Sequence, residues 1–285
     1  MIEIIRLLNE MSPYLLLGFF LAGLMHAFIP AGCYTQHLSR PSFASVWKAA
    51  LFGIPLPLCS CGVIPTAMSL HKEGASKGAV TAFLIATPQT GVDSIFATFS
   101  LMGLPFAIVR PVAALLTSVM GGFWVNVGER KTTDTANRVQ EKSTDASPRS
   151  FAARMKTALN YAFVEMMEDI GKWLVIGMVV AGLITVFVPD SLFDAFRDNT
   201  VASMLLVLVI SVPMYLCATG SIPIAVALMM KGLTPGAALV LLMAGPACNM
   251  ASMLVVRQVL GTRTLVKYIA SIVSGAILFG VVTDL

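Results

Sequence analysis

The segment Gly53-Ile54-Pro55-Leu56-Pro57-Leu58-Cys59-Ser60-Cys61-Gly62-Val63-Ile64-Pro65 decides how this chain folds. It lies inside an apolar region, yet it contains three prolines, two glycines and two cysteines. Proline lacks the N–H group that an uninterrupted helix uses, and its ring clashes with the preceding turn. We therefore expect a helix to break between Cys59 and Gly62. Bare backbone groups are tolerated in hydrocarbon only where they are buried in protein or line a cavity, so the break predicts a binding site.

The composition is that of an integral membrane protein. The chain has 285 residues, of which 57% are hydrophobic and only 12% are charged, whereas a soluble domain carries about 25% charged residues. A bilayer crossing needs ~20 mostly apolar residues, and the apolar runs predict about eight transmembrane segments. The net charge of +4 lies mostly in one central polar stretch. The bias of Lys and Arg toward the cytoplasm explains this charge, so the expected partner is the lipid bilayer and not a nucleic acid.

The second half of the chain repeats the first with a constant shift of 158 residues. We predict an all-α membrane protein with two four-span repeats, residues 1–125 and 161–285, joined by a polar cytoplasmic linker over 126–160. Proline-broken helices would meet at the interface between the repeats, as is common in transporters. The matching pairs are Pro55 and Pro213, Cys59 and Cys217, Gly62 and Gly220, Pro65 and Pro223, Gly74 and Gly232, Gly78 and Gly236, Pro88 and Pro246, and Gly103 and Gly261.

The number of spans predicts the orientation of the two repeats. Four is even, so both repeats should point the same way, related by an axis along the membrane normal. Arg257, Arg263 and Lys267 then fall outside, against the bias of basic residues toward the cytoplasm. Either that bias is weak here, or the segments around Pro88 and Pro246 are re-entrant and the number of spans is different.

Cysteines at the predicted breaks form the candidate substrate site. Thiolates are soft ligands that select Cu(I), Zn and other thiophilic ions. Cys59 and Cys61 flank one residue at the first break, Cys217 lies at the equivalent break, and Cys248 lies in the interruption around Pro246. Up to four sulfur atoms can therefore share one site. The residues expected to break helices are Pro57, Gly62, Pro65, Pro88, Gly220, Pro223 and Pro246.

Polar residues at the two proline-containing interruptions are the auxiliary candidates. Asp93 is the carboxylate that we place deep in a span, where a charged group is costly and marks an ion or proton pathway. A place at a helix end near the membrane surface is the alternative. Gln89 and Thr90 precede Asp93, and Asn249 and Met250 follow Cys248.

Several catalytic patterns are absent from the sequence. We find no P-loop of the form Gly, four residues, then Gly-Lys-Ser or Gly-Lys-Thr, no Ser–His–Asp arrangement and no zinc-protease pattern. The chain is therefore expected to be neither an enzyme nor a nucleotide-driven pump. We expect no resident cofactor, and any soft metal would be cargo.

Three motifs carry a family resemblance: Pro-Leu-Cys-Ser-Cys-Gly-Val-Ile-Pro (57–65), Glu-Gly-Ala-Ser-Lys-Gly-Ala (73–79) and Thr-Pro-Gln-Thr-Gly-Val-Asp-Ser (87–94). They resemble the bacterial predicted-permease family of the arsenic-permease type, and most of all its copper/zinc efflux branch. Ala-Thr-Gly-Ser-Ile-Pro (218–223) and Met-Ala-Gly-Pro-Ala-Cys-Asn (243–249) fit the same family. The resemblance covers nearly the whole chain outside the linker. It implies a bacterial inner-membrane permease that expels soft metal or metalloid species, with Cys59 and Cys61 in the family's thiol motif.

The leading hypothesis is a secondary efflux permease for copper, zinc or a trivalent arsenical, which binds near mid-membrane. A membrane thiol–disulfide carrier is one alternative, because Cys59 and Cys217 can face each other across the repeat axis. Uptake of a sulfur-containing anion is another, with helix N-termini at Gly62 and Gly220 as donors.

Overall fold

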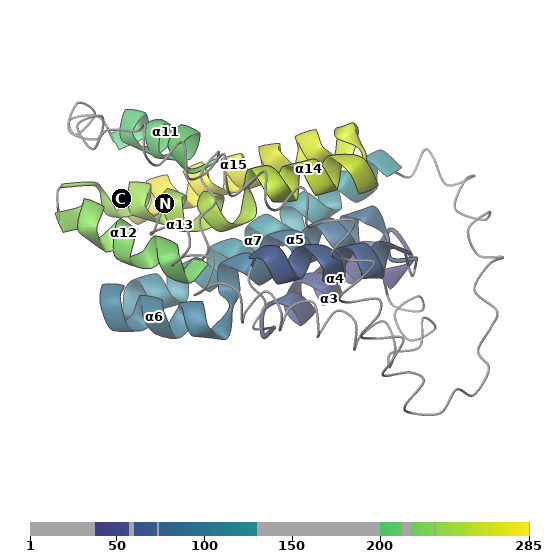
Figure 1. Cartoon of the computed structure of the whole chain (residues 1–285), viewed down its shortest axis with the longest axis horizontal. Coiled ribbons are helices and arrows are strands. Elements are labelled where there is room, and N and C mark those ends of the chain that lie inside the picture. Colours follow the sequence, from purple (N-terminus) through teal and green to yellow (C-terminus); the bar gives the residue numbers. More distant parts are fainter. Residues whose placement is uncertain are drawn as a thin grey trace, which may run out of the picture.

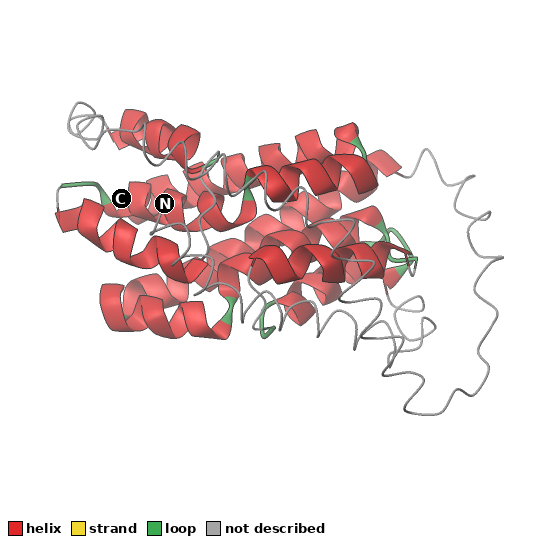
Figure 2. Ribbon diagram, in the orientation of Figure 1, coloured by secondary structure: helices red, strands yellow, loops and turns green. Residues whose placement is uncertain are grey.

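The structure, a computed structural model, describes residues 38–56, 60–72, 74–129, 200–212, 218–230 and 232–284. Every regular element in these ranges is an α-helix (Figures 1 and 2). The helices of the first half are α3 (Phe43–Gly53), α4 (Ser60–Lys72), α5 (Lys77–Thr90), α6 (Val92–Met102) and α7 (Leu104–Glu129). Those of the second half are α11 (Thr200–Ser211), α12 (Ala218–Met230), α13 (Pro235–Ala247), α14 (Met250–Val259) and α15 (Thr262–Asp284).

The helix bounds follow the constant shift that relates the two halves of the sequence. This shift carries α4 onto α12 at both ends, and it carries the first residues of α5, α6 and α7 onto those of α13, α14 and α15. The chain turns at equivalent glycines, which have positive φ angles: Gly74 (96°) and Gly232 (104°), and Gly103 (86°) and Gly261 (91°). Residues other than glycine rarely adopt such angles, so these four turns need glycine.

Helices α5, α7, α13 and α15 pack against one another through glycines. The amide of Gly78 donates to Asn126 Oδ1 (3.1 Å), and the amide of the equivalent Gly236 donates to Asp284 Oδ1 (2.6 Å). A Cβ atom on Gly78 would overlap the carbonyl of Gly122. The backbones therefore approach as closely as small residues allow in membrane helix pairs.

Equivalent helices of the two halves run in opposite directions. Lys267 near the start of α15 donates from Nζ to the carbonyl of Trp124 near the end of α7 (2.9 Å). Further along α15, Gly275 lies against Thr117, which is earlier in α7. Helices α7 and α15 are thus antiparallel, and the two halves are inverted relative to each other. The expectation that both halves point the same way is wrong.

Helices α3 and α4 form a hairpin and not one crossing with a break. The amide of Ser76, just after α4, donates to the carbonyl of Leu38, just before α3 (2.9 Å). The hairpin therefore begins and ends at the same end of the molecule. Its helices have 11 and 13 residues, and at ~1.5 Å per residue neither can cross a core that is ~30 Å thick. Helices α11 and α12 occupy the equivalent positions in the second half.

Helices α5 and α6 together follow α7 along its length. Gly78 at the start of α5 contacts Asn126 near the end of α7, and Arg110 near the start of α7 donates to Thr98 of α6 (2.8 Å). The segment around Pro88 therefore bends and continues, and it does not turn back. Among the described residues, α7 and α15 are each long and apolar enough to cross a membrane, and α13 with α14 makes a third candidate bent by 51°.

Inversion brings the basic turns of both halves to one end of the molecule. The α4–α5 turn and the α14–α15 turn both lie at the end of α7, through the contacts of Gly78 and Lys267. At this end α4 packs against α14, and at the other end α6 packs against α12 (Figure 1). Arg257, Arg263 and Lys267, which parallel repeats would place outside, thus share one end with Lys72 and Lys77.

Replacement of Gly78 by Ala is expected to lower the melting temperature of the purified protein. The added methyl group overlaps the Asn126 side chain and the Gly122 carbonyl. Such overpacking costs ~1–3 kcal/mol, which exceeds the ~1 kcal/mol that Ala gains over Gly in a helix. Gly236→Ala should behave alike, whereas Val112→Ala on the exposed face of α7 should stay within about 0.5 kcal/mol of the wild type. A melting temperature of Gly78→Ala at or above that of the wild type would contradict the packing.

Inversion is tested by labelling from one side of the membrane. Single cysteines that replace Lys72 and Arg263, in a chain whose natural cysteines are changed to Ser, should react with a membrane-impermeant reagent from the same side. Parallel halves of four spans each would place them on opposite sides. A cysteine that replaces the exposed Arg40, close to Leu38 at the same end of the molecule as Lys72, serves as the control for access.

Candidate functional site

The interrupted helices of the two halves meet at the centre of the molecule. Gln89, in the last turn of α5, donates from Nε2 to the carbonyl of Met243 in α13 (3.0 Å). Pro88 lies two residues before the end of α5, and Pro246 lies one residue before the end of α13. Each chain path then breaks, at Gly91 in the first half and at Cys248 and Asn249 in the second.

Three polar side chains next to the two breaks are buried and each has an atom without a described hydrogen-bond partner. Thr87, Gln89 and Asn249 are each 0% exposed. Within the described residues, no hydrogen bond reaches Thr87 Oγ1, Gln89 Oε1 or Asn249 Nδ2. A buried polar group without a hydrogen bond costs roughly 2–7 kcal/mol relative to water. These atoms can therefore receive a polar ligand or groups of the adjoining loops.

The loop that carries the first thiol motif begins beside this centre. Gly53, the last residue of α3, lies against the side chains of Thr87 and Phe83. Residues 54–59 follow Gly53 and lead to α4, which begins at Ser60. The interruption thus ends at Ser60, so Gly62 lies in the first turn of α4 and Pro65 lies further along it, instead of at the break. Gly220 and Pro223 lie at the equivalent positions in α12.

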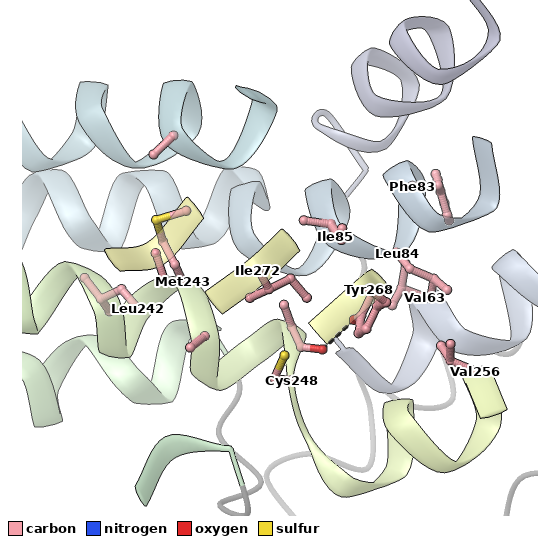
Figure 3. Packing of buried hydrophobic residues seen from close by; sticks show 14 of the residues in the cluster. Val63, Phe83, Leu84, Ile85, Leu242, Met243, Cys248, Val256, Tyr268 and Ile272 are labelled. Carbon is pink, nitrogen blue, oxygen red and sulfur yellow. Dashed lines mark hydrogen bonds between the residues drawn. The ribbon is translucent and has the colours of Figure 1, made fainter. Parts of the chain in front are cut away.

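The second break is held by a set of hydrogen bonds around Cys248. Asn249 Oδ1 accepts from the amide of Ser252 (2.7 Å), and Ser252 Oγ accepts from the amide of Asn249 (3.3 Å). Tyr268 Oη of α15 donates to the carbonyl of Ala247. Figure 3 shows Cys248 at the end of α13, with Tyr268 and Ile272 of α15 among the buried residues near it. This thiol is free and fully buried.

Of the four cysteine side chains predicted to bind the substrate, the structure describes only that of Cys248. Cys59 and Cys217 lie outside the described residues, as does Pro57, and Cys61 lies in α4 but its side chain is outside them too. In the part of the chain that the structure describes, no three or more His, Cys, Asp or Glu side chains lie together in a way that could hold a metal ion. A site that collects Cys59, Cys61, Cys217 and Cys248 stays a prediction.

The auxiliary residues have different surroundings. Thr90 donates from Oγ1 to the carbonyl of Ala86 within α5 (2.8 Å), so its hydroxyl serves the helix end. Asp93 lies at the start of α6 and Met250 at the start of α14, but their side chains are not among those described. Gln89 and Asn249 are the auxiliary residues with buried atoms that have no described partner.

Two buried residues were missed by the sequence reasoning. Arg110 is 0% exposed and donates to Thr98 Oγ1 on α6 (2.8 Å). Tyr268, which occupies the equivalent position to Arg110 in the second half, is 1% exposed. A charged residue within an apolar run is costly in a membrane and marks a functional position, so Arg110 could have been found from the sequence. Tyr268 gives no such signal.

Gln89→Leu is expected to destabilise the contact between the two halves. The variant loses the hydrogen bond to the Met243 carbonyl, which typically contributes about 1 kcal/mol. Thr90→Val is the matched control, because its hydroxyl bonds only within α5 and its loss should cost about half as much. Thermal unfolding of the purified variants checks this order, and a Thr90→Val loss larger than that of Gln89→Leu would contradict it.

Comparisons with known proteins find relatives that align with most of the chain. The chain is 24% identical to a UPF0718 protein of Methanocaldococcus jannaschii, over 94% of this chain and 92% of the relative. It is 25% identical to UPF0718 protein YcgR of Bacillus subtilis, over 75% and 72% of the two chains. It is also 21% identical to a Streptococcus mutans protein, over 94% of this chain and 89% of the relative. The name of that protein is "Putative two-component membrane permease complex subunit".

No solved structure matches the chain at a significant level. The model of one protein family, described as "Predicted permease", matches residues 3–285. That match covers the thiol-motif loops, both broken helices and the central polar residues. A permease moves its substrate and does not convert it, which agrees with a transporter and not an enzyme. The chain belongs to the predicted-permease family.

Proposed function

We propose that this permease is a secondary transporter that expels a thiophilic metal or metalloid species, such as copper, zinc or a trivalent arsenical, across the bacterial inner membrane. The observation that carries the proposal is a pair of buried oxygen atoms, Thr87 Oγ1 and Gln89 Oε1, that have no described hydrogen-bond partner, with Thr87 beside the start of the loop that leads to Cys59. A site at mid-depth between two repeats is the usual arrangement in secondary transporters.

The proposed membrane topology has three crossings and one hairpin in each half. The crossings would be residues 13–30, α5 with α6, and α7 in the first half, and residues 173–189, α13 with α14, and α15 in the second. The α3–α4 and α11–α12 hairpins would then enter from opposite faces. This proposal replaces eight crossings by six, because an odd number in each half is what inverted halves require.

Cys59, Cys61, Cys217 and Cys248 are the proposed ligands of the transported ion. Thiolates bind soft ions, and Cys61 lies in the first turn of α4. The N-terminus of a helix carries a partial positive charge that stabilises a nearby thiolate. Gln89 and Asn249 would contact the outer atoms of the substrate, with Thr90, Asp93 and Met250 close by in the sequence.

Transport would proceed by movement of the two halves around this site, which opens to each face in turn. Binding of a soft ion to a thiol releases a proton, so transport should depend on pH even without a separate driving ion. Asp93 is the proposed proton carrier. The end with the basic turns would face the cytoplasm, in agreement with the bias of Lys and Arg, and the polar linker that follows α7 would lie on that side.

Metal tolerance of a sensitive bacterial host tests the ligands. Cells that express the wild type should survive higher concentrations of at least one of copper, zinc, arsenite, methylarsenite or mercury, and should contain less of it. The Cys59→Ser/Cys61→Ser variant should lose this protection, because a hydroxyl is a poor ligand for a soft ion. Its membrane level should remain that of the wild type.

Cys33→Ser is the matched control, since Cys33 lies outside the proposed site and the variant should protect fully. Full protection by the double variant would contradict the thiol site. Protection by neither protein, with a Cys59–Cys217 disulfide that cycles with a thioredoxin-like partner, would favour the thiol–disulfide carrier instead.

A further inference from the structure

The two helix breaks are equivalent in sequence but are held in different ways. In the second half, Asn249 and Ser252 form a capping box at the start of α14. Ser252 Oγ also donates toward the carbonyl of Ala247 (3.1 Å), which accepts from Tyr268 as well. Hydrogen bonds from two helices therefore fix the angle between α13 and α14.

Among the side chains that the structure describes, the first break lacks this set of hydrogen bonds. Gly91 stands at the position in the first half that is equivalent to Asn249, and the start of α6 has no side-chain cap. Ser94 stands at the position of Ser252, and its buried Oγ has no described hydrogen-bond partner. The first break thus has one half of a capping box, and the residue that would complete it is a glycine.

The ends of the two helices do not differ in this way. Gly103 follows α6 with a φ of 86°, and the equivalent Gly261 follows the C-cap of α14 with a φ of 91°, so the difference between α6 and α14 lies at their starts. A side-chain cap contributes ~0.5–2 kcal/mol, and α6 lacks one where α14 has one. Segments with few such bonds open locally at lower free energy than the rest of the protein.

We propose that α6 is the moving gate of this permease and that α14 is its fixed counterpart. The inference rests on the proposed transport function for what passes the gate, but the difference in mobility between α6 and α14 does not depend on the substrate. Helix α6 packs against α12 at the end opposite the basic turns, so in the proposed orientation the gate lies at the face that receives an exported species.

Arg110 connects this gate to the scaffold. Its guanidinium donates to the hydroxyl of Thr98 in the middle of α6 (2.8 Å). The equivalent Tyr268 instead bonds Ala247, which precedes the second break. The Arg110 bond joins α6 to α7 beyond the first break, whereas the Tyr268 bond holds the second break itself.

Hydrogen exchange of the full-length wild type in lipid nanodiscs tests the mobility without any metal. Amides of α6 (92–102) are expected to exchange at least tenfold faster than those of α14 (250–259). Equal or slower exchange in α6 would overturn the proposal. Asn249→Gly, which removes the second cap, should raise exchange in α14 toward the rate of α6.

Gly91→Asn tests the link to transport, because it completes the capping box with Ser94. The expected results are slower exchange in α6, a higher melting temperature, and export of the tolerated metal slowed several-fold. Gly91→Asn/Ser94→Ala is the matched control and should recover part of the wild-type exchange. Slower exchange in α6 with export at the wild-type rate would overturn the gate. Because exchange is measured without a metal, this outcome can be told apart from one in which the proposed substrate is wrong. If Gly91→Asn does not fold, the wild-type and Asn249→Gly exchange results decide.

Discussion

Close contact between glycine backbones in α5, α7, α13 and α15 is the interaction on which the rest of the structure depends. Membrane helices gain little from moving apolar side chains out of lipid, so small residues that allow backbones to touch supply much of the packing energy. Gly78 and Gly236 meet Gly122 and Gly280, the same contact made once in each half. This tight core leaves the short hairpins and the broken helices to be arranged around it.

The membrane also explains why the helix breaks and the polar groups next to them are buried. Hydrocarbon cannot satisfy backbone or side-chain polar groups, so helix breaks have to lie inside the protein. Thr87 and Gln89 in one half and Asn249 in the other are buried next to these breaks. A permease needs such a place, because a substrate with charge or polarity has to find partners midway through the bilayer.

Differences between the duplicated halves can give transport a direction. A symmetric pair of halves treats both faces of the membrane alike, whereas Gly91 and Asn249, or Arg110 and Tyr268, are equivalent positions with different chemistry. Each difference changes how a helix break is held. Inversion turns these local differences into differences between the two faces.

Much of the helix plan could be read from the chain itself. The constant register between the halves predicted paired glycines and prolines, and α4 and α12 begin and end in that register. Local chemistry is enough for this, because proline stops a helix and a turn with positive φ needs glycine. Gln89 and Asn249 were likewise singled out from their place at proline-containing interruptions.

Only the tertiary structure decided in which direction each helix runs and which helices are in contact. A proline-rich loop between two apolar segments can break one crossing or turn the chain back, and both have the same local sequence. The hydrogen bond between Ser76 and Leu38 selects the hairpin, and the contact of Lys267 with Trp124 selects inverted halves. These bonds join residues that are far apart in the chain, so no local pattern encodes them, and only packing brings them together.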